Sequence, residues 1–338
     1  MGIAADWWRG GLTWRCALLL PVASVYGVLM TVRGALYRRG WLKAERLPVP
    51  VLIVGNLVVG GTGKTPLAVA LANSLAARGF TPGLVSRGYG AQIDAPLEVS
   101  PEADPSRVGD EPLLIRRRTG MPVWVAPDRV AAARALLAAH PRTDVLISDD
   151  GLQHLRLARD FEIAVFDNRG AGNGRLLPSG PLREPLQRID SVDAVVINGA
   201  GAAGVPRRAW AMTLEFDAPH QINAPHTAAP LQSLARKRLA AVAGIGNPAR
   251  FFDALAATGL TADCRAFPDH HAFQAADFNS IDADIILMTE KDALKCAAFA
   301  DPRLWVAPVT ANVPTGLIDA IVERLEWTRN CLKSSSAR

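Results

Sequence analysis

Short apolar runs alternate with helical stretches along most of this chain. The first run, 51–54, is typical of a buried strand, and the stretch 66–77 after it is typical of a helix. Further strands are predicted at 81–86, 123–126, 145–148, 162–166 and 194–198, with a helix at 129–139 among them. This alternation predicts an α/β fold with a doubly wound parallel sheet, in which ligands bind at the carboxyl ends of the strands.

A second, smaller α/β unit is predicted after a change of composition at 201–235. That region consists of Ala-, Gly- and Pro-rich loops around a linking or edge strand at 210–216. Beyond it, strands are predicted at 239–242, 263–267, 285–288 and 304–309, and helices at 248–257, 274–281 and 314–327. The pattern therefore divides the chain into an N-terminal segment 1–46, a first domain 47–205, a second domain 206–330 and a polar tail 331–338.

The N-terminal segment 1–46 differs from the rest in polarity. Between Arg15 and Arg33 lie 17 uncharged residues, and four of the eight tryptophans of the chain fall in the segment. It also holds seven Arg or Lys and two acids, so it carries the whole net charge of +5. Cations and tryptophans around an apolar helix favour a membrane interface, although a helix packed in the protein core is the alternative. The length leaves open whether such a helix spans the bilayer or lies in its surface.

The rest of the chain is close to neutral, which disfavours a nucleic-acid partner. No segment indicates a protein partner. The four cysteines are scattered and form no C-x-x-C pair, which favours a reducing compartment.

The strand 51–54 runs directly into a glycine-rich loop that ends in Lys64 and Thr65. Such a loop brings backbone N–H groups close to phosphates at the start of a helix. Lys64 is expected to reach the β- and γ-phosphates of ATP, and Thr65 to hold Mg²⁺. The strict motif has a glycine where this chain has Val58. The candidate nucleotide-binding residues are Val58, Val59, Gly60, Gly61, Thr62, Gly63, Lys64 and Thr65.

Two acids, Asp149 and Asp150, end the apolar strand 145–148. In phosphate-loop proteins an acid at this place orients Mg²⁺, whereas elsewhere it is an ordinary turn or cap residue. Gln153 and His154 follow closely and are candidates for positioning the same ion or the substrate.

Two further clusters are candidates for proton transfer. Asp110 and Glu111 begin a predicted helix, where acids are common, and Asp110 is a candidate general base toward an attacking hydroxyl. His270 and His271 follow Asp269; adjacent histidines point apart, so a shared metal is not expected. One of them could pair with an aspartate, or both could be surface residues.

Two weaker patterns carry alternatives. Residues 244–249 follow the spacing G-x-G-x-x-A of dinucleotide-binding proteins, but Pro248 suits the first position of a helix equally well. Residues 289–292 (TEKD) end a predicted strand and form either a base-reading loop or a capped turn.

Taken together, these residues resemble the tetraacyldisaccharide 4'-kinase family of lipid A biosynthesis, over nearly the whole chain. The motifs that carry the resemblance are VGNLVVGGTGKTP, LVSRGYG, VGDEP, SDDGLQH, GNGRLLPSGPLREP, VING, FPDHH and LMTEKDALK. The resemblance implies transfer of the ATP γ-phosphoryl group to the 4'-hydroxyl of tetraacyldisaccharide 1-phosphate, which gives lipid IVA. It implies ATP and Mg²⁺ as cofactors. It also implies a location at the cytoplasmic face of the inner membrane, reached through the N-terminal helix.

The same resemblance implies roles for individual residues. Lys64 and Thr65 correspond to the phosphate-loop lysine and the metal-binding threonine, and Asp149 and Asp150 to the acidic pair near Mg²⁺. Asp110 corresponds to the proposed base, with His270 as its partner. The residues implied near the substrate are Glu111, Gln153, His154, Arg183 and Glu184. Glycines at 170, 172 and 174 suggest a mobile lid.

A membrane-bound phosphate-loop switch or partitioning ATPase is the alternative from another class. Many of these proteins carry a lysine directly before the paired glycines, where this chain has Val59. That difference and the FPDHH cluster favour the kinase.

Overall fold

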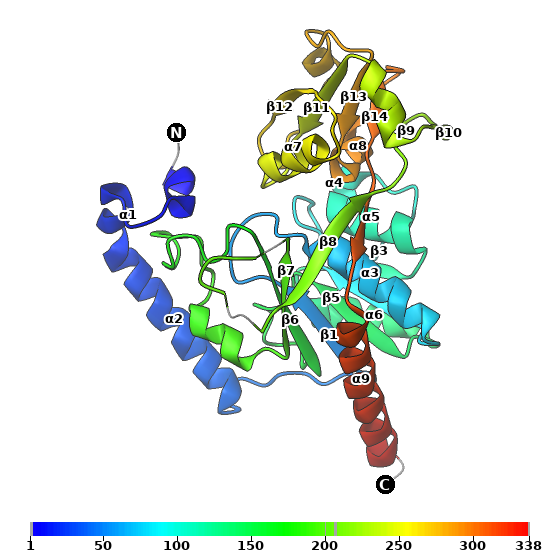
Figure 1. Ribbon diagram of the computed structural model, residues 1–338. Coiled ribbons are helices and arrows are strands. Elements are labelled where there is room, and N and C mark those ends of the chain that lie inside the picture. The colour runs from blue at the N-terminus through cyan, green and yellow to red at the C-terminus, as the bar shows by residue number, and fades with distance from the viewer. Residues whose placement is uncertain (1–2, 200, 206–207, 337–338) are drawn as a thin grey trace.

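The computed structural model describes residues 3–199, 201–205 and 208–336, and it contains two sheets in this part of the chain (Figure 1). The larger sheet has the strand order β15-β8-β7-β6-β1-β5-β2-β4-β3. Its strands are β1 (Val51–Gly55), β2 (Pro82–Ser86), β3 (Leu97–Glu98), β4 (Val123–Val125), β5 (Val145–Asp149), β6 (Phe161–Asp167), β7 (Ala194–Asn198), β8 (Trp210–Phe216) and β15 (Val309–Asn312). The strands from β8 to β4 pair in parallel, and only the outermost strands β3 and β15 run antiparallel to their neighbours.

Helices cover both faces of the larger sheet, as a doubly wound fold requires. One face buries apolar side chains against α3 (Lys64–Ala77), α4 (Pro105–Val108), α5 (Asp110–Thr119) and α9 (Thr315–Ser336). The other face packs against α6 (Arg129–Ala139) and the short helix η2 (Leu186–Ser191). The central strands β1, β2, β5 and β6 are therefore fully buried, and the predicted parallel doubly wound sheet is confirmed.

The smaller sheet has the order β10-β9-β14-β13-β11-β12 and lies at the top of Figure 1. Its strands are β9 (His220–Gln221), β10 (Ala224–Ala228), β11 (Leu239–Ala243), β12 (Asp263–Ala266), β13 (Ile285–Met288) and β14 (Leu304–Val306). The helical segments of this unit are α7 (Pro248–Ala257), α8 (Glu290–Cys296), η3 (Leu231–Arg236) and η4 (Ala275–Phe278). Because α7 and α8 bury apolar residues in separate clusters, this sheet also has a core on each face.

Three segments after residue 206 join the larger sheet rather than the smaller one. β8 and β15 pair with each other and extend the larger sheet, and α9 packs its apolar stripe on that sheet. The stripe of α9 consists of Leu317, Ile321 and Leu325, which are completely buried. The two sheets therefore do not divide at residues 205 and 206: the chain crosses to the smaller sheet after β8 and returns to the larger sheet with β15.

Local boundaries differ from the predictions in three places. The predicted strand 304–309 is two strands, β14 and β15, which belong to different sheets and are separated by Ala307 and Pro308. The predicted helix 274–281 is only the short turn η4. The last helix, expected over 314–327, continues to Ser336 into the predicted polar tail, of which residues 337–338 lie outside the described part.

The N-terminal segment forms η1 (Ile3–Trp8), α1 (Trp14–Leu18) and the long helix α2 (Leu20–Arg38) at the side of the larger unit (Figure 1). Within the described residues, α2 is the one helix long and apolar enough to cross a membrane. One side of α2 is tied to the protein: the Tyr26 hydroxyl donates to the Arg183 carbonyl (2.7 Å), and Arg33 donates to the Gln153 carbonyl (3.1 Å). The large apolar residues that α2 exposes are Val22, Val25, Val28, Leu29 and Val32. This exposure is incompatible with the alternative of a helix buried in the core.

Candidate active site

The phosphate loop joins β1 to α3 at the carboxyl edge of the larger sheet. Gly63 precedes the first residue of α3 and has a φ of 99°, and Gly60 has a φ of 90°. Both values lie in the left-handed region that favours glycine. A Cβ on Gly63 would also clash with Nδ2 of Asn198, so this position requires glycine for two separate reasons.

Buried polar side chains brace the loop from within. The Asn56 side-chain amide donates to the Gly60 carbonyl (3.2 Å) and to the Thr62 hydroxyl (3.3 Å). Asn198, at the end of β7, donates to the Thr62 carbonyl (3.1 Å). Because Asn56 and Thr62 are completely buried, this network fixes the shape of the loop.

Val58 and Val59 lie between β1 and the first glycine of the loop, Gly60. Val58 is completely buried and forms a bridge with Leu182, and the N–H of Val59 donates to the Pro181 carbonyl (2.9 Å). Position 58 is thus filled by a buried apolar side chain, and the positive φ values of the loop begin at Gly60.

Lys64 and Thr65 come together at the start of α3 with Asp149, the last residue of β5, and Asp150, which follows it. The Lys64 ammonium lies 3.6 Å from Oδ1 of Asp150, and the Thr65 hydroxyl donates to Oδ2 of Asp149 (3.4 Å). Asp149 is completely buried, and its Oδ1 has no hydrogen-bond partner. Burial and the nearby carboxylates of Glu111 and Asp150 raise the pKa of Asp149 above its usual range, although Lys64 opposes them.

Asp150 is held in a different environment from its neighbour. It has a φ of 50°, which is rare for a residue with a side chain, and Nη1 of Arg183 lies 3.1 Å from both of its carboxylate oxygens. Burial raises the pKa of Asp150, but Lys64 and Arg183 outweigh burial and lower it to about 2. Asp150 is therefore an anion at neutral pH.

Gln153 and Glu184 adjoin this group, and His154 does not. The Gln153 amide donates to Glu184 (2.8 Å) and to the Asn56 carbonyl (3.1 Å). His154 instead lies 3.4 Å from Asp128, at the start of α6. Burial and the charge of Arg129 lower the pKa of His154 to about 4. The structure thus brings Gln153, Arg183 and Glu184 together beside Asp150 and places His154 against Asp128 at the start of α6.

Asp110 and His270 meet although they come from different sheets. Nδ1 of His270, from the loop after β12, lies 3.4 Å from Oδ2 of Asp110 at the start of α5. Lys295 lies at the same distance from that oxygen, and Lys291 lies at 4.0 Å. Burial raises the pKa of Asp110, but His270 and the two lysines outweigh burial and lower it to about 2.

His271 points away from this pair and contacts Asp277 (3.0 Å), so the adjacent histidines face different partners, as the sequence predicts. His270 has a φ of 59°; it and Asp150 are the two non-glycine residues with positive φ in the described part of the chain. Both strained positions therefore belong to this one site.

The sequence analysis assigned no role in the site to Lys291, Lys295 or Arg169, although Lys291 lies in the segment 289–292 that it singled out. Lys291 and Lys295 lie one turn apart on α8, whose first turn is capped, as one of the two alternatives for 289–292 expects: the Thr289 hydroxyl accepts from the N–H of Asp292 (3.2 Å). Arg169 donates to the Gly61 carbonyl (3.3 Å) and to the buried Asp167 at the end of β6. The place of 289–292 at the end of a predicted strand, with lysines four residues apart, is the signal that pointed to the first two.

The G-x-G segment at 244–249 packs against the phosphate loop. A Cβ on Gly246 would lie 2.7 Å from the backbone N of Gly61, so glycine here allows two loops to touch. Asn247 donates to Asp167 (3.3 Å), and Arg250 lies 3.9 Å from the same carboxylate. The loop after β11 thus closes one side of the phosphate loop.

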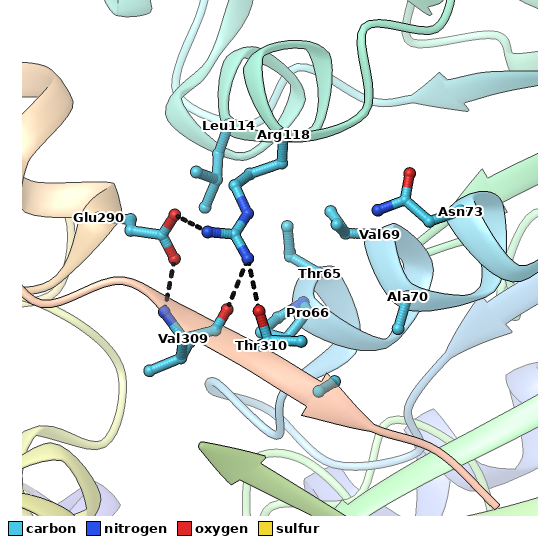
Figure 2. Close-up of a pocket in the computed structure, with 11 residues that line it drawn as sticks. Thr65, Pro66, Val69, Ala70, Asn73, Leu114, Arg118, Glu290, Val309 and Thr310 are labelled. Carbon is cyan, nitrogen blue, oxygen red and sulfur yellow. Dashed lines mark hydrogen bonds and ion pairs between the residues drawn. The ribbon is translucent and has the colours of Figure 1, made fainter. Parts of the chain in front are cut away.

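A cavity of about 70 Å³ lies on the other side of Thr65, between α3, α5, α8 and β15 (Figure 2). Arg118 crosses its wall and donates to Glu290 (3.2 Å), to the Val309 carbonyl (3.2 Å) and to the Thr310 hydroxyl (2.8 Å). The bond to Glu290 joins the last turn of α5 to α8 of the smaller unit, and the other two join it to β15 of the larger sheet.

Comparisons with known proteins agree on one family. The family model for tetraacyldisaccharide-1-P 4'-kinase matches residues 15–326. The tetraacyldisaccharide 4'-kinase of Chromobacterium violaceum is 49% identical, over 96% of this chain and 98% of the relative. The enzyme of the same name from Janthinobacterium sp. (strain Marseille) is 51% identical, over 96% and 95%.

A solved structure shows the same architecture. The crystal structure of LpxK from Aquifex aeolicus, in complex with ATP, superposes with a TM-score of 0.75 at 29% sequence identity. The match covers 92% of this chain and 99% of that one.

Proposed function

Because this chain belongs to the tetraacyldisaccharide-1-P 4'-kinase family, we propose that the site between its two sheets performs the reaction of that family. The chain is an ATP-dependent kinase that transfers the γ-phosphoryl group to the 4'-hydroxyl of tetraacyldisaccharide 1-phosphate, in lipid A biosynthesis. The observation that carries the residue assignments is that Asp110 and His270 meet beside the phosphate loop.

The phosphate loop positions ATP. Lys64 and the backbone N–H groups at the start of α3 supply positive charge where the transferred group becomes more negative. Phosphoryl transfer needs positioning and charge neutralisation more than covalent chemistry from the protein. We therefore assign ATP binding to residues 58–65, with Lys64 at the β- and γ-phosphates.

Mg²⁺ fits the residues beside the loop. Asp149 presents a buried oxygen without a hydrogen-bond partner, and the Thr65 hydroxyl lies next to its other oxygen. Mg²⁺ commonly binds one or two carboxylates together with substrate phosphates and water. Thr65, Asp149 and Asp150 would hold the ion, which would neutralise phosphate charge when bound.

Asp110 and His270 form the proton-accepting side of the site. Asp110 is ionised at neutral pH, and its Oδ2 lies 3.4 Å from Nδ1 of His270 and from Nζ of Lys295. We propose that this carboxylate accepts the proton of the sugar hydroxyl, while His270 holds its orientation. A carboxylate of low pKa is a weak base, so we expect placement rather than basicity to supply most of its contribution.

The lipid substrate is proposed to enter beside α2. Its four acyl chains favour a membrane, and α2 offers an exposed apolar side next to the segment that carries Arg183 and Glu184. We propose that α2 lies in the cytoplasmic surface of the inner membrane, with its inner side bound to the protein. Arg183 and Glu184 would then bind the polar part of the lipid, together with Glu111 and Gln153, whereas His154, which faces Asp128, would not contact it.

Substitutions at Asp110 and His270 test the proton-accepting pair, with the neighbouring His271 as the control. In a lipid phosphorylation assay, Asp110→Asn and His270→Gln should each lower kcat about 100-fold or more while ATP affinity stays near that of the wild type. His271→Gln is the matched control, because this neighbouring histidine faces Asp277, and it should keep kcat within about twofold of the wild-type value. Near-normal kcat in Asp110→Asn would refute the base assignment.

A further inference from the structure

Lys291 is the residue of the smaller unit that contacts most of the proton-accepting cluster. Its ammonium lies 3.0 Å from Oε1 of Glu111, 3.5 Å from Nε2 of His270 and 4.0 Å from Oδ2 of Asp110. The side chain is only 14% exposed. One cation from α8 therefore touches two carboxylates of α5 and the histidine that pairs with one of them.

The start of α8 is rigid, so the position of Lys291 is well defined. Asp292, completely buried, accepts from the Thr289 hydroxyl (2.7 Å) and from the N–H of Gly244 (3.0 Å). These bonds anchor the first turn of α8 to the end of β11. A lysine on such an anchored turn has little freedom to leave its partners.

A second ion pair joins the same two helices farther along α5. Glu290, adjacent to Lys291, receives a bond from Arg118 (3.2 Å) and accepts from the N–H of Val309 (3.1 Å), as Figure 2 shows. Because Glu111 and Arg118 lie at the two ends of α5, the pairs act on the helix at separate points. Together they set the orientation of α5 relative to α8.

Loss of the Lys291 ammonium would leave Glu111 and Asp110 close together with less opposing charge. Burial lowers the pKa of Lys291, but Glu111 and Asp110 outweigh burial and raise it, so the side chain is a cation whenever the pair is formed. Carboxylates in a poorly solvated place repel each other and move or take up protons when a neighbouring cation is removed.

We propose that Lys291 is a positioning residue for the phosphoryl transfer, which fixes Glu111 and the Asp110–His270 pair across the junction of the two sheets. It acts through these side chains and not by binding ATP or lipid. The proton-accepting side of the site is then complete only while α8 is seated against α5. This inference rests on the proposed function.

The test uses the full-length kinase in detergent micelles with ATP and tetraacyldisaccharide 1-phosphate. Lys291→Met should lower kcat about 10- to 100-fold and leave the KM for ATP within about twofold, because the phosphate loop is intact. Lys291→Arg, which keeps the charge, should recover part of the loss. Lys237→Met, a change at an exposed lysine of the same unit, should behave like the wild type.

A double-mutant cycle identifies the route of the effect. If Lys291 acts largely through Glu111, the double variant Lys291→Met/Glu111→Gln should be no slower than the slower single variant. Effects that multiply both in this cycle and in the matching cycle with His270→Gln would overturn the proposal. A raised KM for ATP with unchanged kcat would also overturn it, because Lys291 would then be a nucleotide ligand. Should Lys291→Met fail to fold, Lys291→Arg and Glu111→Gln test the proposal instead: each should lower kcat and leave the KM for ATP within about twofold of the wild type. An unchanged kcat in both would overturn the proposal.

The same assay separates this proposal from the proposed function. A wild-type enzyme that forms no phosphorylated lipid overturns the function and, with it, the role of Lys291. Equal rates for the wild type and Lys291→Met overturn the role of Lys291 alone.

Discussion

Replacing Gly63 by alanine should damage the phosphate loop by an amount that can be worked from its geometry. A residue with a Cβ in the left-handed region costs about 1–2 kcal/mol. The new Cβ would also displace the Asn198 amide, which donates to the Thr62 carbonyl (3.1 Å), and loss of that bond costs about 1 kcal/mol more. The total of about 2–3 kcal/mol corresponds to roughly a 30- to 150-fold change in an equilibrium constant.

Two measurements capture that cost, because it can fall on folding or on ATP binding. Urea unfolding reports the part that the folded loop retains as strain, and calorimetric titration with a non-hydrolysable ATP analogue reports the part that appears when the loop must adopt its binding shape. Gly79→Ala is the matched control at the other end of α3: Gly79 has a φ of 85°, and its Cβ would meet no heavy atom within 4 Å. This control should lose only the backbone contribution in stability and bind the analogue normally.

The contribution of Asn198 can be isolated in the same experiments. In an Asn198→Ala background the clash is absent, so Gly63→Ala should cost only about 1–2 kcal/mol. Wild-type affinity together with wild-type unfolding in Gly63→Ala would refute the description of the loop.

Three further predictions concern stability and the membrane. Asp167→Asn should lower the free energy of unfolding, measured in urea, by about 3–5 kcal/mol, because it leaves the guanidinium groups of Arg169 and Arg250 without their carboxylate. The control Asp282→Asn, at a side chain that is 88% exposed, should cost less than about 1 kcal/mol. Equal costs for the two variants would contradict the account. The pKa of Asp110 is lowered from 3.8 to about 2 in the fold, so the stability that this carboxylate contributes is present above about pH 4 and is lost as the pH falls through about 2. Between these pH values the free energy of unfolding should therefore fall by about 2 kcal/mol less in Asp110→Asn than in the wild type. An equal fall in both proteins would exclude the shift. Changing three exposed valines of α2 to serine should remove about 1 kcal/mol of apolar burial each and weaken sedimentation with anionic vesicles about 100-fold, whereas unchanged partitioning would exclude α2 as the anchor. These valines are Val25, Val28 and Val32.

The local parts of the fold could be predicted from the sequence because their signals are local. Helices 129–139 and 248–257 and strands 194–198 and 285–288 have the predicted bounds, since periodicity and flanking turn residues define them. The phosphate loop was recognisable for the same reason: a strand, three glycines, Gly-Lys-Thr and a helix lie within one short stretch.

Features that depend on pairing across the chain could not be predicted in this way. β8 and β15 pair although they lie about a hundred residues apart, and nothing local in either strand identifies its partner. Likewise, α9 runs on through a polar sequence because its first turns are anchored by Leu317 and Ile321 in the core. The contact of Lys291 with Glu111 follows from the packing of two units, which the spacing of residues in one segment does not reveal.

The most direct test of the account is transfer of radioactive label from γ-labelled ATP to purified tetraacyldisaccharide 1-phosphate in micelles, with wild type and Lys64→Ala side by side. The account predicts labelled lipid with the wild type and nearly none with the variant, because the loop lysine is needed to hold the transferred phosphate. ATP hydrolysis without labelled lipid would contradict the kinase and favour a membrane-bound nucleotide switch. Equal labelling by both proteins would contradict the assignment of the phosphate loop.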